Sequence, residues 1–292
     1  MNVKANELLN NFSKLNFFFK KTLKIVRLNR KKKVSLRLRK TFNAINIGCY
    51  EIKIAENRNE IREAQALRYQ VFFRENSAKP NFRQKIFKRD FDLHDRIADH
   101  LIVIDKSKYN KIIGTYRLLR GTIAKINYGY YSENEFDLTN IKKLFSSKYI
   151  LELGRSCVNS NYRTGLILKL LWYGIAKYIH VYQIKLLFGC ASFHGVNIND
   201  VEDKIFFLRE NFALPKQIEI KSLQENIFFN KINQTRGKII FNDLPPLIKG
   251  YLRAGAMISQ EYFVDYDFNS IDLCALVFTD NISHKYKKKF IN

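Results

Sequence analysis

The sequence predicts a mixed α/β domain, with a central sheet flanked by helices, preceded by a basic amphipathic helical arm. First, 46% of the 292 residues are hydrophobic, so the chain can bury a substantial core. Second, segments that alternate like strands are interspersed with segments of helical spacing. Third, one strand pattern ends in a polar loop that opens a long helix and leads into another strand. We therefore expect an arm over residues 1–48 and one domain over residues 49–292.

The predicted arm is strongly basic. Residues 1–50 contain thirteen lysines and arginines but one acidic residue, Glu7, so they carry +12 of the net charge of +24. Apolar side chains fall within an arc of about 80° at helical spacing: Leu8, Phe12, Leu15, Phe19, Leu23 and Val26. Three interpretations stay open, namely an anionic membrane surface, an ordinary helix packed on the domain, and a nucleic-acid arm. No helix-turn-helix, zinc-finger or RNP pattern supports the last.

The sequence predicts neither a transmembrane helix nor a signal peptide. Its most apolar region, residues 166–193, is interrupted by Lys169, Lys177, His180 and Lys185. The N-terminus lacks a clean apolar core followed by a small-residue cleavage site. We therefore expect contact with a membrane to be peripheral.

The first half of the domain reads as a strand, a helix and a pair of strands. Residues 50–55 (YEIKIA) alternate like an opening strand, and residues 60–73 have helical spacing. Residues 100–105 (HLIVID) and 111–119 (KIIGTYRLL) resemble two strands joined by the polar turn KSKYN.

The second half contains the strand–loop–helix–strand unit. Its predicted parts are a strand at 149–158, a polar loop at 159–164, a long helix at 165–182 and a buried strand at 185–192. The last elements are short helices at 205–211 and 247–252 and a closing strand at 273–278. A loop that opens a long helix presents free N–H groups and the positive end of the helix dipole, so we expect it to bind an anion.

Four cysteines lie far apart and form no CxxC pair. This pattern indicates a reducing compartment, with cysteine used as a small apolar residue. We expect no metal site and no nucleophilic role for Cys157 or Cys190.

At this point the order of several strings resembles a known family. The strings, which span roughly residues 50–280, are LRYQVFFRE, DFDLHDRIADH, GTYRLL, YYSENEF, ELGRSCV, FGCASFHG, PLIKGYLRAGA and DYDFN. Together they resemble GNAT acyltransferases, in particular the branch of acyl-homoserine-lactone synthases and ornithine-lipid N-acyltransferases. The fuller match is to the L-ornithine Nα-acyltransferase family, and it implies a GNAT-like mixed central sheet.

The resemblance implies a set of site residues. Patterns shared with the acyl-homoserine-lactone synthases are Arg-x-x-x-Phe, an acidic-x-Asp-x-x-Asp string, a strand Arg-Leu and Glu-x-x-Arg. They fall on Arg68 and Phe72; on Asp90, Asp92 and Asp95; on Arg117 and Leu118; and on Glu152 and Arg155. By this resemblance Glu152 and Arg155 are catalytic, and the substrate-binding residues are Arg68, Phe72, Asp90, Asp92, Asp95 and Arg117.

The resemblance also implies the substrates. They are an acyl carrier protein bearing a (3-hydroxy)acyl group and an amino acid, L-ornithine, with a lyso-ornithine lipid as product. Tyr162, Arg163, Thr164 and Gly165 would bind the donor's phosphopantetheine. This loop lacks the glycine pattern of ordinary GNAT pyrophosphate loops, which favours a carrier protein over coenzyme A. No cofactor, metal or nucleic acid is expected, and the enzyme would be cytoplasmic, peripheral on the inner face of the cytoplasmic membrane.

Each role has a structural alternative. Glu152 is the expected general base, yet it could instead form an ion pair with Arg155, although the two would point to opposite faces of a regular strand. The three aspartates could hold a cationic amino acid or form a solvated, self-paired loop. Arg68, Arg117 and Arg155 could bind the acceptor carboxylate or bridge structural carboxylates, and we expect a network joining them to the acidic string.

Two further functions stay open. The same fold could serve an acyl-homoserine-lactone synthase or an N-acyltransferase for another amino acid. From another class, the chain could be a non-catalytic basic protein that binds membranes or nucleic acid. The retention of Glu152, Arg155 and the acidic string argues against this second alternative.

Overall fold

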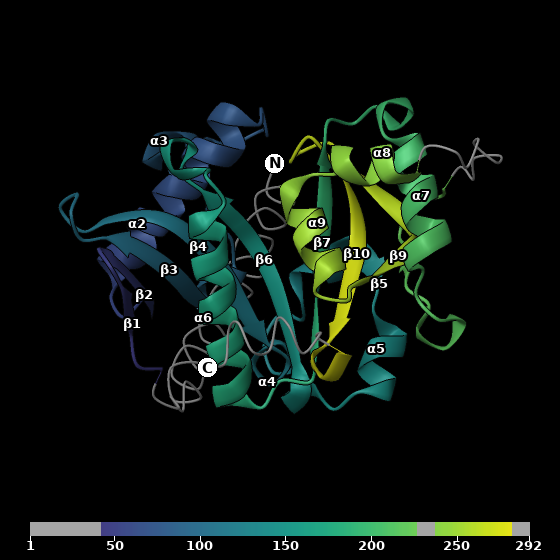
Figure 1. Cartoon of the computed structure of the whole chain (residues 1–292), viewed down its shortest axis with the longest axis horizontal. Helices are drawn as coiled ribbons and strands as arrows, with labels where there is room; N and C mark the ends of the chain where they lie inside the picture. Colours follow the sequence, from purple (N-terminus) through teal and green to yellow (C-terminus); the bar gives the residue numbers. More distant parts are fainter. Residues whose placement is uncertain (1–41, 227–236, 282–292) are drawn as a thin grey trace, which may run out of the picture. The chain divides into compact units, whose positions relative to one another are not determined.

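The domain is built on one eight-stranded sheet. The computed structural model describes residues 42–226 and 237–281 (Figure 1). The apolar stripe and the lysines and arginines of the predicted arm lie outside these ranges. In spatial order the strands are β1 (Ile45–Ile47), β2 (Tyr50–Ile54), β3 (Asp99–Asp105), β4 (Lys111–Arg120), β6 (Ile150–Val158), β7 (Leu186–His194), β10 (Ser270–Phe278) and β9 (Met257–Asp265). β6 and β7 pair in parallel, and the other neighbours are antiparallel.

Helices cover both faces of the sheet. They are α2 (Arg58–Tyr69), α3 (Phe82–Phe87), α4 (Gly121–Lys125), α5 (Thr139–Leu144), α6 (Leu166–Tyr182), α7 (Glu202–Phe212), α8 (Gly237–Asp243) and α9 (Pro246–Arg253). A π-helical turn (Gln70–Glu75) extends α2, and a two-stranded sheet pairs β5 (Phe136–Asp137) with β8 (Lys221–Ser222). Short 3₁₀ turns are His94–Arg96, Tyr131–Asn134, Ser147–Tyr149, Ser160–Tyr162, Ile198–Asp200, Lys216–Ile218 and Thr279–Asn281.

The alternation of strand residues places the core on two sides. In β3, Leu101 and Val103 pack in the cluster that contains α6, α7 and α9, whereas Ile102 and Ile104 pack against α2 on the other face. Figure 1 shows α6 crossing the front of the β3–β6 half and α9 the front of the β7–β10 half. The mixed α/β class predicted from the sequence is confirmed. No helix among the described residues combines the length and the apolar character needed to cross a bilayer.

Several elements differ from the prediction. The sheet already includes β1, which lies before the expected boundary near residue 48, because a turn at Gly48 (φ +58) folds residues 45–47 back onto β2. The edge strand β9 was not predicted from the sequence, since the polar run Ser259–Gln260–Glu261 interrupts its apolar pattern.

Candidate active site

The candidate site lies where β6 and β7 separate. Only Ile150–Glu152 pair with Leu186–Phe188, after which the two strands diverge, as Figure 1 shows. The strands press together at the end of this pairing: a side chain on Gly189 would bring its Cβ to 2.1 Å from the carbonyl oxygen of Leu153. A cavity of about 240 Å³ opens beyond this point, lined by both strands. We call this region the fork.

A β-bulge lies in β6 at the fork. Thr115 of β4 pairs with Cys157, but Arg117 pairs with Gly154, so β6 holds one extra residue. Arg155 takes up the extra length with a left-handed backbone (φ +51), and such bulges re-aim the side chains of a strand. As a result Glu152 and Arg155 both line the cavity. The expectation that they point to opposite faces, which assumed a regular strand, is wrong.

Three donors hold the carboxylate of Glu152, which is 4% exposed. Oε1 accepts hydrogen bonds from the backbone N–H (2.8 Å) and hydroxyl (2.7 Å) of Ser132, and Oε2 accepts one from the backbone N–H of Tyr131 (3.0 Å). Arg155 forms ion pairs elsewhere, so the alternative of a Glu152–Arg155 pair does not describe this structure. The carboxylate is therefore fixed at the cavity wall, and Oε2 accepts one hydrogen bond from the described residues.

Arg68 is fully buried and joins two of the three predicted aspartates. Its Nε donates to Asp90 Oδ2 (2.8 Å), and its Nη2 donates to both carboxylate oxygens of Asp95 (2.9 and 2.8 Å). Burial opposes ionisation of Asp95, but Arg68 and then Arg117 outweigh it and hold the pKa of Asp95 well below its ordinary value. Removing one member would leave a buried uncompensated charge.

Asp92 joins the other two arginines to this network. Its Oδ2 accepts from Arg117 Nη1 (2.6 Å) and lies 3.4 Å from Arg155 Nη2, while Arg155 Nε lies 3.3 Å from Asp90 Oδ2. Arg117 and Arg155 overcome the effect of burial and lower the pKa of Asp92. The expected network of arginines and carboxylates is therefore present.

The network reaches the cavity through its arginines. Arg117 and Arg155 line the cavity, as does Phe72, whereas Arg68 and the three aspartates are not among the described residues that line it. The guanidinium carbon of Arg155 lies 4.3 Å from the ring centroid of Tyr131 and 4.1 Å from that of Phe268. The carboxylates Asp90, Asp92 and Asp95 are occupied by arginines in this arrangement, so their predicted direct contact with substrate stays a prediction.

The predicted phosphopantetheine loop leads into α6. Gly165 has φ +85 at the N-cap, and no side chain caps this helix end. Arg163 is half exposed, pairs with Glu75, and donates from Nε to the carbonyl of Val158 (3.1 Å). The hydroxyl of Tyr162 donates to Asp105 Oδ2 (3.0 Å), and Thr164 is exposed. The open helix end and Gly165 have the expected form, while Arg163 and Tyr162 already have protein partners.

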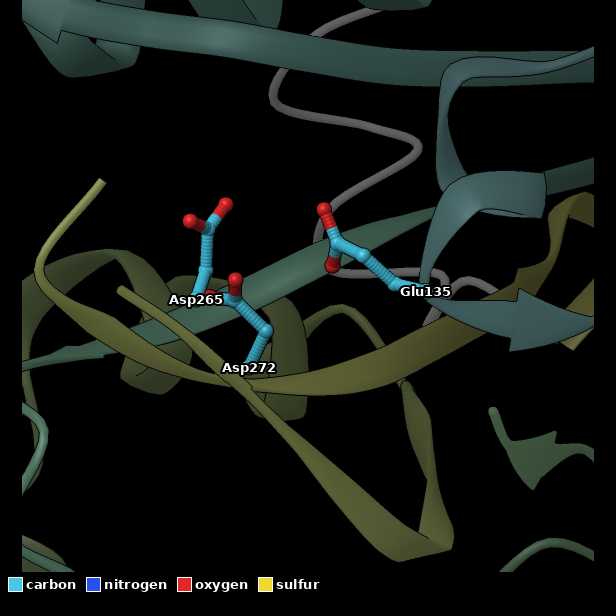
Figure 2. A group of neighbouring side chains, drawn as sticks. All are labelled: Glu135, Asp265 and Asp272. Atoms are coloured by element: carbon cyan, nitrogen blue, oxygen red, sulfur yellow. The ribbon is translucent and has the colours of Figure 1, made fainter. Parts of the chain in front are cut away.

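The structure adds three carboxylates that the sequence analysis did not select. Glu135 follows the turn that holds Glu152, Asp265 ends β9, and Asp272 lies on β10; all three line the cavity, and Figure 2 shows their carboxylates turned toward one another. Burial, followed by the charge of Asp272, raises the pKa of Glu135 well above its ordinary value. Burial also raises the pKa of Asp272 to about 6, which Asp265 reinforces and the hydroxyls of Ser192 and Ser270 oppose.

A signal for two of them was present in the sequence. Glu135 lies in the string YYSENEF and Asp265 in DYDFN, both of which carry the family resemblance. Asp272 gives no such signal. The closing strand is predicted to start at residue 273, so Asp272 falls in the loop before it. The three carboxylates offer oxygens within 4.8 Å of one another, a grouping that a cation could occupy. The expectation of no metal stays a prediction.

The cysteines near the site are buried, which disfavours their thiolate form. Burial raises the pKa of Cys157 to about 12 and that of Cys190 well above its ordinary value. The Cys190 thiol donates to Glu135 Oε2 at 3.0 Å. These environments disfavour the thiolate, in agreement with the expectation that neither is a nucleophile. Cys49, by contrast, is exposed rather than buried.

Comparison with known proteins places the chain in a family. Residues 67–173 match the acetyltransferase (GNAT) domain. The L-ornithine N(alpha)-acyltransferase of Agrobacterium fabrum is 37% identical over 247 residues, covering 82% of this chain and 84% of that protein. That of Brucella abortus is 36% identical over 253 residues, covering 82% and 88%. Among solved structures, the acyl-homoserine-lactone synthase LasI has a TM-score of 0.42 at 15% identity, covering 78% of this chain and 89% of that one. The chain is an acyltransferase and belongs to the L-ornithine Nα-acyltransferase family.

Proposed function

We propose that this acyltransferase moves a 3-hydroxyacyl group from an acyl carrier protein to the α-amino group of L-ornithine, giving a lyso-ornithine lipid. The acceptor is proposed from the relatives, which are named for L-ornithine. The observation that carries the reaction type is the fork, where a fixed carboxylate, Glu152, stands at a cavity between two separating strands.

Amide formation from a thioester requires a base, a positioned amine and donors for the oxyanion. The amine nitrogen attacks the thioester carbonyl carbon, and the carbonyl oxygen becomes the oxyanion of a tetrahedral intermediate while the amine proton passes to Glu152 directly or through a water. The oxyanion then collapses, the C–S bond breaks, and the leaving thiolate takes up the proton held by Glu152. Beyond Glu152 the edge of β6 that faces β7 has no strand partner in the described chain, so its backbone N–H groups can donate to the oxyanion.

The arginine–aspartate network positions the cavity wall in this proposal. Asp90 and Asp92 hold Arg155, and Arg117 is fixed by Asp92, so both guanidinium groups are pre-oriented at the cavity. A pre-oriented guanidinium loses little conformational freedom when it binds the α-carboxylate of an amino acid. In this proposal Arg117 and Phe72 contact the substrate, and Arg155 acts beside Glu152 as a catalytic residue. Arg68, Asp90, Asp92 and Asp95 keep their predicted role in substrate binding, which they serve by holding Arg117 and Arg155 in place.

The donor is proposed to bind at the N-terminus of α6. The uncapped first turn and Gly165 can accept a single phosphate, and Arg163 can exchange Glu75 for that phosphate. Acyl carrier proteins present an acidic surface beside their phosphopantetheine, which suits the net charge of +24. The arm, with its cations and apolar stripe, is proposed to hold the enzyme on the anionic inner face of the cytoplasmic membrane, where the product belongs.

Purified full-length protein tests the donor and the acceptor together. We expect 3-hydroxyacyl carrier protein to exceed the matching acyl-coenzyme A in kcat/KM by at least about tenfold, roughly 1.4 kcal/mol, and added salt to reduce the difference. Mass spectrometry should identify the Nα-acyl-ornithine product. Arg163→Ala should lower kcat/KM with both donors, because both contain the pantetheine phosphate, whereas Arg62→Ala, at an exposed position of α2, should not. Equal rates with acetyl- or long-chain acyl-coenzyme A, or no acylated ornithine, would contradict the proposal.

A further inference from the structure

Three carboxylates form an acidic wall of the cavity at the β9–β10 side of the fork. Glu135 and Asp272 are each 3% exposed, and Asp265 is partly exposed. Their oxygens lie within 4.8 Å of one another, although they come from three separate segments (Figure 2). We call this set the carboxylate triad. The fold has therefore brought three acidic side chains together, two of them buried.

Protein groups only partly satisfy the triad. Ser270 donates to Asp272 Oδ2 (3.1 Å), and the hydroxyl of Ser192 also stabilises the Asp272 carboxylate. The Cys190 thiol donates to Glu135 Oε2, and two backbone N–H groups of the β9–β10 turn donate to Asp265 Oδ1 (2.8 Å each). Asp272 Oδ1 is buried and accepts no hydrogen bond from the described part of the chain. A buried acceptor without a donor is costly, and here it belongs to a side chain that lines the cavity.

No described lysine, arginine or histidine forms an ion pair with the triad. The cation that acts on it is Arg155, whose charge lowers the pKa of both Glu135 and Asp272 but ranks behind the effect of burial. Arg155 is itself paired with Asp90 and Asp92. The opposite wall of the cavity is thus cationic and neutralised by its own partners, whereas no ion pair among the described residues neutralises the triad.

A primary ammonium group has the complementary chemistry. It carries one positive charge and three N–H donors, which can be shared among three carboxylates. We propose that Glu135, Asp265 and Asp272 bind the side-chain ammonium group of a diamino-acid acceptor, while its α-carboxylate faces Arg117 and Arg155. This inference rests on the proposed function and adds to it the residues that select a cationic side chain.

Acceptor selectivity tests the proposal. L-Norvaline has the same three-carbon side chain as L-ornithine without the terminal amine. With the full-length enzyme and 3-hydroxyacyl carrier protein, we expect L-ornithine to exceed L-norvaline in kcat/KM by on the order of 30-fold or more, the effect of one buried charge pair. Asp272→Asn should remove most of this preference by raising KM for L-ornithine, with little change for L-norvaline. Asp267→Asn makes the same change of charge on an exposed residue of the same hairpin, outside the cavity, and should keep the preference.

The two proposals fail in different ways. Acylation of L-ornithine by an Asp272→Asn enzyme with unchanged KM would overturn the triad assignment and leave the proposed function standing. If no turnover occurs, calorimetric titration of both amino acids in the presence of unacylated holo carrier protein still tests the triad, since L-ornithine alone should bind and Asp272→Asn should abolish binding. Binding of Mg²⁺, Ca²⁺ or Mn²⁺ to chelator-treated enzyme that Asp272→Asn abolishes would make the triad a metal site and overturn the assignment.

Discussion

At the scale of single residues, the buried carboxylates of the cavity differ in how many hydrogen bonds they accept. Glu152 receives three hydrogen bonds from one turn, which fix its position. Glu135 and Asp272 are as deeply buried but receive fewer donors, and their pKa values are raised. The first arrangement suits a group that must hold one geometry during a reaction, and the second suits a group that awaits a positively charged partner.

Replacement of Glu152 tests its role as general base. Glu152→Gln should lower turnover by about 10²–10⁴, the usual effect of losing a base, and should remove the acidic limb of the pH–rate profile. Ser132→Ala removes one donor to this carboxylate but leaves the carboxylate itself, so we expect a smaller loss and a retained limb. If both variants lose activity equally and the acidic limb survives in each, Glu152 has a structural role.

Asp272 should destabilise the ligand-free protein at neutral pH. Its pKa is about 6 in the folded protein against an ordinary value of 3.8, so the folded state binds the proton more tightly and stability falls as the pH rises from about 4 to about 6. Asp272→Asn should therefore raise the free energy of unfolding at pH 7.5 by on the order of 1–3 kcal/mol. The gain should shrink toward pH 4. A variant less stable than the parent at pH 7.5 in chemical denaturation would contradict this account.

The residues of the network were predictable, but their arrangement was not. The sequence identified all three arginines and all three aspartates, since their spacing follows a family pattern. Which of them meet depends on the bulge at Arg155, a left-handed backbone at a residue that is neither Gly nor Asn and so leaves no sequence signal. The triad could not be predicted for a related reason, because its members come from three segments that only the completed sheet brings together.

At the scale of elements, the fork depends on close contact between two strands. Gly189 follows the last paired residue of β7, and its lack of a side chain lets β7 approach the backbone of Leu153. The position where the strands part is therefore set by a backbone contact. The strand–loop–helix–strand unit was predicted within a residue or two because its apolar runs are long, but the divergence of its two strands depends on this contact, which no periodicity reports.

A methyl group at Gly189 should move the fork. The added Cβ would meet a backbone carbonyl at 2.1 Å, which cannot rotate away, so we expect Gly189→Ala to lower the free energy of unfolding by about 1–3 kcal/mol. Gly154→Ala on the neighbouring strand is the matched control, because its Cβ would have ordinary contacts at 3.9 Å. Urea denaturation of both variants measures the difference. Equal stability of the two variants would show that β6 and β7 can move apart at Gly189 without loss of stability.

At the scale of the whole molecule, half of the net positive charge belongs to the first fifty residues. Residues near the end of the predicted arm already contact the sheet domain: Phe42 packs against the core and Lys177 Nζ donates to the carbonyl of Asn43 (2.8 Å). Removal of residues 1–40 leaves Phe42, Asn43 and the sheet in the chain.

This division makes the membrane role of the arm testable. In flotation with vesicles containing anionic lipid, full-length protein should float and the protein lacking residues 1–40 should stay in the dense fraction. Vesicles of zwitterionic lipid alone should bind both weakly, because each cation near an anionic leaflet contributes about 1 kcal/mol. Acylation of ornithine in solution should persist after truncation. Equal flotation of the two proteins on anionic vesicles would exclude the arm as the anchor.

The positions of the cationic and acidic walls of the cavity have a consequence for the stereoselectivity of the enzyme toward its amino-acid acceptor. Arg117 and Arg155 lie on β4 and β6, Asp265 and Asp272 lie on β9 and β10, and Glu152 stands at the fork between them. In the proposed complex these groups fix the carboxylate, the side chain and the amine of the acceptor, which are three different substituents of one carbon atom. A mirror-image amino acid can satisfy any two of these sites but must turn its third substituent away. The enzyme should therefore be enantioselective, and the preference for the L-acceptor should weaken when the side-chain site is removed by Asp272→Asn.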